Sequence, residues 1–155
     1  MSHDYSKIYA SAEATLENFT SLQKKIKKDF NYDVKYVRFP GGASNTISRN
    51  YCEGVMTEAV KKVQEESLEY YDWNVDVDDA GSARTPSEIY NNFVDGILPG
   101  VENIVLMHDG EGHMPTAKAL QEIINYAKEN GYVFTAISEN TTPAKHLSLI
   151  HISEP

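Results

Sequence analysis

Polar side chains follow three apolar stretches of the sequence, at the points where those stretches end. They are an arginine, a group of acids, and a histidine with its acidic neighbour: Arg38, Asp76, Asp78, Asp79, His108 and Asp109. A guanidinium can hold a carboxylate through two parallel hydrogen bonds. A carboxylate beside an imidazole orients the ring and favours its protonated form, and imidazole exchanges protons near neutral pH. Each residue alone could be an ordinary loop residue, but together they favour a proton-transfer site.

The apolar stretches differ in period, which predicts both helices and strands. Helical spacing predicts helices at 10–28, 50–68, 85–97 and 116–130. Short β-branched and aromatic runs predict strands at 34–39, 70–77, 103–108 and 132–137. The third helix carries a start signal, because Thr85, Pro86 and Glu88 stand in the order of a capping box with proline at the first helical position.

The order of these elements predicts the fold class and the place of the site. The alternation α-β-α-β-α-β-α-β predicts an α/β fold with parallel strands and helices outside them, in an open sheet or a barrel. Sites of such folds form where strand ends open into loops, so Arg38, Asp79 and His108 are expected to converge there. The chain begins on a helix with no preceding strand, which would leave an exposed sheet edge. We therefore expect it to be the later part of a larger domain.

Composition narrows the function classes. The 155 residues suffice for one domain. The net charge of -9 argues against nucleic acid as a partner, because phosphate binding needs clustered basic residues. No apolar stretch is long enough to span a bilayer, and the start shows no signal-peptide pattern. The single Cys52 excludes an internal disulfide framework and a cysteine-based zinc site.

Three segments resemble, in order and spacing, the third, fourth and fifth motifs of one enzyme family. They are residues 38–42, 72–79 and 106–108. The family is the polysaccharide deacetylases (NodB-homology, family 4 carbohydrate esterases), and the likeness is greatest to peptidoglycan N-acetylglucosamine deacetylases. The resemblance implies a distorted β/α barrel, a partial deacetylase domain over residues 1–146, and hydrolysis of N-acetyl groups from amino sugars in a cell-wall polymer.

The resemblance also implies a role for each matching residue. His108 would be the general acid that protonates the leaving amine, and Asp79 would tune that histidine. Arg38 would orient the catalytic base. The backbone N–H at Gly41 would bind the oxyanion, where glycine lets the backbone come close. Leu106 would line the acetyl pocket.

A divalent metal such as zinc or cobalt is implied as cofactor. Residues 2–5 resemble the end of the second motif, so His3 would be one metal ligand. The other histidine and the first motif, which supplies the base and a metal-binding aspartate, have no counterpart in the sequence. A single histidine binds metal weakly, because a metal site needs its full ligand set. We therefore expect this 155-residue chain to be inactive alone.

One departure from the family concerns the groove wall. The family often has tryptophan after the aspartate matched by Asp79, and here that position is Ala80. Trp73 is close in sequence and could serve as a substrate-binding wall, although alternation along a strand also allows it to face the core. We expect an acetyl pocket that is wider or differently walled.

The end of the chain departs from the family altogether. Residues 147–155 resemble translated adaptor sequence, and we expect this segment to be non-native and without function. His146 and His151 are accordingly not expected to be ligands. His113, in a glycine-rich loop after His108, is expected to be solvated, with lining of the groove as the lesser alternative.

Two other functions remain open on sequence alone. The first is a degenerate deacetylase that binds an N-acetylated glycan without cleaving it, which Ala80 favours weakly. The second is a flavodoxin-like or receiver-type domain, although residues 38–42 lack the spacing of a phosphate-binding loop. The family resemblance places the full-length protein outside the cell or in the cell wall. The sequence gives no indication of oligomeric state.

Overall fold

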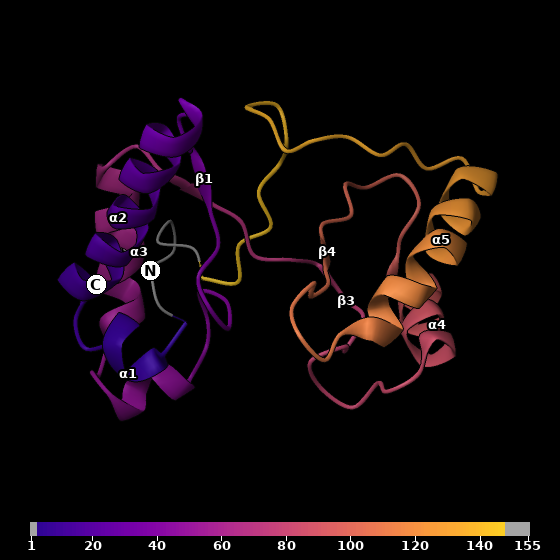
Figure 1. Ribbon diagram of the computed structural model, residues 1–155, viewed down its shortest axis with the longest axis horizontal. Helices are drawn as coiled ribbons and strands as arrows, with labels where there is room; N and C mark the ends of the chain where they lie inside the picture. Colours follow the sequence, from indigo (N-terminus) through magenta and orange to yellow (C-terminus); the bar gives the residue numbers. More distant parts are fainter. Residues whose placement is uncertain (1–2, 148–155) are drawn as a thin grey trace, which may run out of the picture. The chain divides into compact units, whose positions relative to one another are not determined.

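The computed structural model describes residues 3–147, which divide into two compact units (Figure 1). Unit 1 comprises residues up to Asp72 together with the segment from Lys145 onward, and unit 2 comprises Trp73–Ala144. The segment interpreted as non-native, residues 147–155, lies outside the described residues except for Leu147. No helix in the described part of the chain is both long and apolar enough to cross a membrane.

Unit 1 contains four helical segments and one pair of strands. Its elements are α1 (Tyr5–Ile8), α2 (Ala12–Phe30), β1 (Tyr36–Val37), η1 (Ile47–Asn50), α3 (Val55–Glu65) and β2 (Glu69–Tyr70). The two strands pair in parallel, and α2 packs on α3. The helix α2 begins where the Ser11 side chain accepts a hydrogen bond from the Ala14 N–H, and it ends at Asn31 in the left-handed region (φ 51°).

Unit 2 contains two helices and the second pair of strands. Its elements are β3 (Val75–Asp76), α4 (Pro86–Gly96), β4 (Val105–Leu106) and α5 (Met114–Glu129). The strands again pair in parallel, with Val75 opposite Val105 and Asp76 opposite Leu106. The capping box predicted before α4 is confirmed. The helices α4 and α5 lie side by side over a buried apolar core that includes Ile89, Phe93 and Ile123.

The four predicted helices and the parallel direction of the strands are confirmed, but the strands differ from the prediction. The run 70–77 is not one strand, because β2 and β3 are separate and belong to different units. The predicted strand at 132–137 is wrong, since the structure gives these residues no strand and exposes 84% of Val133. A strand exists only where its backbone groups pair with a neighbour, and no described strand pairs with this run. The described strands form two two-stranded parallel sheets, so the barrel stays a prediction.

Candidate functional site

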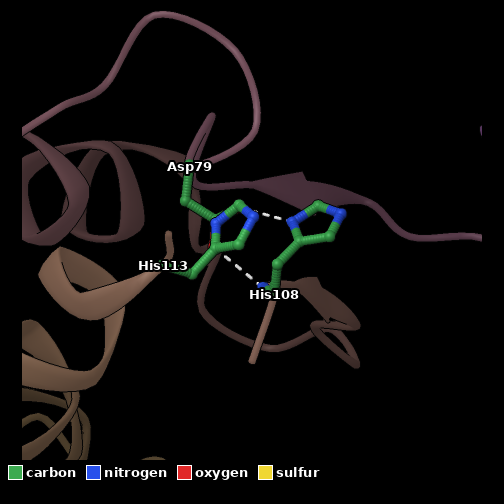
Figure 2. Close-up of side chains that lie close together, drawn as sticks. All are labelled: Asp79, His108 and His113. Carbon is green, nitrogen blue, oxygen red and sulfur yellow. Dashed lines mark hydrogen bonds and ion pairs between the residues drawn. The ribbon is translucent and has the colours of Figure 1, made fainter. Parts of the chain in front are cut away.

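An aspartate and a histidine meet at the ends of β3 and β4. The parallel register places Asp76 beside Leu106, so the residues that follow the two strands emerge at the same edge. There His108 Nδ1 lies 2.7 Å from Asp79 Oδ1, and the His108 backbone N–H donates to Asp79 Oδ2 at 2.8 Å. The side chains of this pair and of His113 lie together (Figure 2). Unit 2 therefore brings together two of the predicted site residues, Asp79 and His108.

Asp76 and Asp78, the other two acids that were predicted to lie at this site, form the turn that precedes α4. Asp78 is in the left-handed region (φ 58°), and its backbone N–H donates to Asp76 Oδ1 at 2.8 Å. The Asp78 carboxylate accepts the backbone N–H of Ser82 at 2.9 Å and also the Ser82 hydroxyl. These hydrogen bonds from Ser82 lower the pKa of Asp78. Gly81 has no room for a side chain, because a Cβ would collide with the Asp78 carboxylate. Of the three acids, only Asp79 forms hydrogen bonds with His108.

The Asp79 carboxylate is almost fully buried, with 1% of its side chain exposed. Burial acts to raise its pKa, but hydrogen bonds from the His108 side chain, the His108 backbone and Thr116 outweigh burial and lower the pKa. Thr116 Oγ1 donates to Asp79 Oδ2 at 2.8 Å. An ionised carboxylate can only accept hydrogen bonds, so we assign the proton to His108 Nδ1. That leaves His108 Nε2 as the ring nitrogen that exchanges a proton.

His113 lies against this pair, which corrects the expectation that it is solvated. Its ring stacks on the His108 ring, with the centroids 5.0 Å apart and 23° between the planes. Its Nδ1 lies 3.8 Å from Asp79 Oδ2, and only 23% of its side chain is exposed. A local signal was present in the sequence. Pro115 marks the first turn of a helix, so His113 could have been placed at the start of that helix, close to the end of the preceding strand.

Two cavities border the pair, and His113 lines both. One, of about 470 Å³, is lined by Met107, His108, Asp109, Gly110, His113, Met114, Thr116, Ala117 and Leu120. The other, of about 410 Å³, is lined by Asp79, Ala80, Ala83, Arg84, Ile89, Gly112, His113, Pro115 and Thr116. The small side chain of Ala80 thus borders open space, and His108, 39% of whose side chain is exposed, is accessible from the first cavity.

Asp79, His108 and His113 could hold a metal ion, since one ligand atom from each lies within 4.8 Å of the others. Both Asp79 oxygens already accept hydrogen bonds from protein groups. A metal bound through the imidazoles alone would keep these bonds, because a ligating histidine commonly donates its other N–H to a carboxylate. His3 is exposed and belongs to no group of three potential ligands among the described residues. Its predicted role as a metal ligand stays a prediction.

Arg38 and Gly41 lie in unit 1. The half-buried Arg38 donates from Nε to the Tyr71 carbonyl at 3.1 Å and from Nη2 to the Asp72 carbonyl at 3.2 Å. Burial lowers the pKa of Arg38, and the charge of Asp72 opposes that shift. Gly41 has φ 74°, and a Cβ there would collide with the Tyr5 hydroxyl, so this turn requires glycine. The predicted meeting of Arg38 with the pair in unit 2 stays a prediction.

Leu106 and Trp73 belong to unit 2 and are both half-buried. Leu106 ends β4, two residues before His108, and pairs with Asp76 across the sheet. Among the described residues, neither Leu106 nor Trp73 is one of the partly buried apolar side chains that pack against the unit 2 core. Their predicted roles in binding substrate stay predictions.

Three solved structures are similar to this chain. The catalytic domain of peptidoglycan N-acetylglucosamine deacetylase from Eubacterium rectale matches at 33% identity and TM-score 0.86, over 94% of this chain and 66% of that one. A CE4 esterase from Streptococcus mutans matches at 25% identity and TM-score 0.71, over 87% and 59% of the two chains. A polysaccharide deacetylase from Bacillus cereus shares the fold at 24% identity and TM-score 0.75, over 94% and 68%.

The chain spans less than two thirds of the length of the first two of these structures, 66% of one and 59% of the other. No family model matches the sequence, and no curated protein matches it. The similarity therefore rests on the shared fold, together with the 33% sequence identity to the Eubacterium rectale enzyme.

Proposed function

Because this chain belongs to the polysaccharide deacetylases of carbohydrate esterase family 4, we propose that it serves the hydrolysis of N-acetyl groups from amino sugars in a cell-wall polysaccharide. The observation that carries the proposal is the Asp79–His108 pair, in which a buried carboxylate holds the Nδ1 side of an accessible imidazole. The structural likeness to deacetylases favours this function over a flavodoxin-like or receiver-type domain.

His108 acts as the general acid in this proposal. Amide hydrolysis expels an amine, which is a poor leaving group until it is protonated. With Nδ1 held by Asp79, Nε2 is the ring nitrogen that gives the proton to the leaving amine. The cavity of about 470 Å³ beside His108 gives a sugar access to the ring.

The match to the family motifs also assigns roles to two residues of unit 1 and to residues of unit 2. Gly41 offers a backbone N–H at a turn that excludes any side chain, which suits close approach to an oxyanion. Arg38 donates hydrogen bonds to two backbone carbonyls that follow β2. We assign Arg38 the role of orienting the catalytic base. Leu106 and Trp73 are assigned to the walls of the acetyl and sugar pockets.

The proposed reaction depends on a divalent metal, which would polarise the acetyl carbonyl and a water when bound. His3 is assigned as one ligand, by its match to the second motif. Among the described residues, no group of three potential ligands includes His3, so they do not form a complete metal site there. The proposed activity therefore belongs to a domain with its full ligand set, and we expect the 155-residue chain to turn over no substrate alone.

The proposed partner is an N-acetylated glycan polymer such as peptidoglycan or a chitin-like chain. The Eubacterium rectale relative is a peptidoglycan N-acetylglucosamine deacetylase, and this supports N-acetylglucosamine as the sugar. A polymer of this kind lies outside the membrane. We therefore propose an extracellular or cell-wall location for the full-length protein.

A binding experiment tests the proposal on the chain itself. An N-acetylglucosamine oligomer should perturb the NMR signals of His108 and Leu106, and the same oligomer without acetyl groups should perturb them at least tenfold less strongly at equal concentration. The His108→Ala variant should bind more weakly, whereas His146→Ala, which removes a histidine of unit 1, should bind as the unmodified chain does. Equal responses to the two oligomers, or no response at His108, would contradict the proposal.

An acetate-release assay with added zinc or cobalt tests the chemistry. We expect no turnover by this chain. Turnover that disappears in His108→Ala would contradict the inactivity of the chain and support His108 as the acid. Turnover that His108→Ala leaves unchanged would contradict the assignment of His108.

A further inference from the structure

Thr116, in the first turn of α5, holds the Asp79–His108 pair through the Asp79 oxygen that does not contact the histidine ring. The threonine is buried, with 5% of its surface exposed, and its hydroxyl donates to Asp79 Oδ2 at 2.8 Å. The same oxygen accepts the His108 backbone N–H at 2.8 Å. The other oxygen, Oδ1, accepts from His108 Nδ1 at 2.7 Å.

An aspartate needs such external donors if its carboxylate is to be held in one orientation. The last side-chain torsion of aspartate joins an sp³ to an sp² carbon, and this kind of torsion is broad. One donor on Oδ2 still allows the carboxylate to turn about the Cβ–Cγ bond. Two donors on Oδ2, from different segments of the chain, fix the carboxylate plane and aim Oδ1 at His108 Nδ1.

The first turn of α5 places Thr116 next to Asp79. The chain turns at Gly112 (φ 91°), and His113 follows as the N-cap residue with Pro115 in the first turn. The His113 carbonyl accepts the Ala117 N–H at 3.3 Å, which closes that turn. Thr116 thus sits three residues after the cap, with its side chain directed toward the end of β3. Because α5 packs on α4, the backbone that carries the Thr116 hydroxyl is held in place.

We propose that Thr116 is a positioning residue for His108 and acts through Asp79 by fixing which ring nitrogen carries the proton. With Oδ1 aimed at Nδ1, His108 keeps the Nδ1–H tautomer and leaves Nε2 free. Only the catalytic consequence of this arrangement rests on the proposed deacetylase function. The tautomer itself is a property of the ground state and can be measured without substrate or metal.

Thr15 provides a matched comparison, because it is also a buried threonine near the start of a helix. It lies in α2 of unit 1 and is fully buried, and its hydroxyl donates to the Ile8 carbonyl at 2.7 Å. The same hydroxyl lies 3.2 Å from the Ser11 carbonyl, so both of its acceptors are backbone groups. Loss of either threonine hydroxyl removes buried hydrogen bonding and should lower stability to a similar extent. Only loss of the Thr116 hydroxyl should alter His108.

The test is NMR of the full chain carrying ¹⁵N-labelled histidine, because ring nitrogen shifts report the tautomer. In Thr116→Val we expect the ratio of the Nδ1–H to the Nε2–H tautomer of His108 to fall about fivefold or more, as one hydrogen bond to a charged group is lost. Thr116→Ser keeps the hydroxyl and should keep the ratio of the unmodified chain. Thr15→Val should leave the His108 ratio unchanged.

An unchanged His108 tautomer ratio in a folded Thr116→Val would overturn the inference, and so would an equal change in Thr15→Val. Should Thr116→Val not fold, the unmodified chain provides the test. Its Thr116 hydroxyl proton should exchange slowly enough with water to be observed near neutral pH, and a rapidly exchanging hydroxyl would overturn the inference. Failure of glycan binding would instead contradict the proposed function and leave the tautomer result standing.

Discussion

Two buried aspartates, one in each unit, have different hydrogen-bond partners. Asp72, in unit 1, is fully buried, and its two oxygens accept the backbone N–H groups of Ala43 and His146, each at 2.8 Å. Asp79, in unit 2, accepts from the His108 ring and the Thr116 hydroxyl as well as from one backbone N–H. Burial alone therefore does not identify a functional acid, and the partners decide what each carboxylate can do.

The partners of Asp72 indicate a structural role. Its oxygens link the loop after β1 to residues 145–147, a segment that returns to unit 1 after unit 2 in the sequence. Backbone amides do not titrate, so these bonds cannot take part in proton exchange. Asp79 instead bonds an imidazole that remains 39% exposed, and this connects a buried charge to the accessible surface. Such a connection is what proton transfer to a substrate requires.

The largest expected effect comes from removing the structural aspartate. Asp72→Ala leaves two backbone N–H groups without their acceptor, and each hydrogen bond to a charged group contributes about 1.5–3 kcal/mol. We expect the free energy of unfolding of unit 1 to fall by about 3–5 kcal/mol, measured by urea denaturation with NMR signals of unit 1. Asp29→Ala, at an exposed ion pair with Lys25, is the control and should change stability by less than about 1 kcal/mol. A loss below about 1 kcal/mol for Asp72→Ala would remove the contrast between the two aspartates.

Acid should weaken unit 2 through Asp79. Because the pKa of Asp79 is lowered in the folded state, its contribution to stability is present above the unfolded pKa of about 3.9 and is lost as pH falls through the folded value. We expect a urea midpoint for unit 2 that falls as pH decreases below about 4. Asp79→Asn should be less stable at pH 7 and lose this part of the pH dependence. The same pH profile in both proteins would mean that the carboxylate is not held by its hydrogen bonds.

His3 in unit 1 and the histidines of unit 2 should differ in how strongly they bind a metal ion. If the Asp79, His108 and His113 group takes zinc, His113→Ala should weaken zinc binding by about tenfold or more, because one ligand of a small set is lost. His3→Ala should leave zinc affinity unchanged in this chain. The measurement is a zinc titration followed by the NMR signals of the histidine rings. A larger loss of affinity in His3→Ala would assign the metal to unit 1.

The smallest expected effect compares the helix caps of the two units. Ser11→Ala in α2 and Thr85→Ala in α4 should each lower stability by about 1 kcal/mol, which is typical of a lost N-cap. Each change should act on its own unit, as shown by hydrogen exchange of the helix that loses its cap. Neither should alter the NMR signals of the His108 ring. A cap variant that changed those signals would show that unit stability, rather than particular contacts, controls the site.

Local features of the sequence predicted the helices but not all the strands. The capping box at Thr85 and Glu88 and the apolar periodicity act within a few residues, so α4 could be predicted from neighbouring positions. A strand depends on a distant partner, and the run 132–137 has the composition of a strand without a described one. Its exposed Val133 and Phe134 show that apolar alternation alone does not bury a segment.

The residues of the site could be predicted from local sequence, but their hydrogen-bond partners could not. The order of residues was enough to show that a carboxylate and an imidazole follow successive apolar runs, because residue type and strand ends are local properties. The hydrogen bonds of Asp79 to His108, 29 residues away, and to Thr116, 37 residues away, could be seen only in the folded chain, as could the backbone groups that hold Asp72. It also placed His113 against the pair. Hydrogen bonds between distant segments depend on where packing and strand register bring the backbone, and no local pattern records that position.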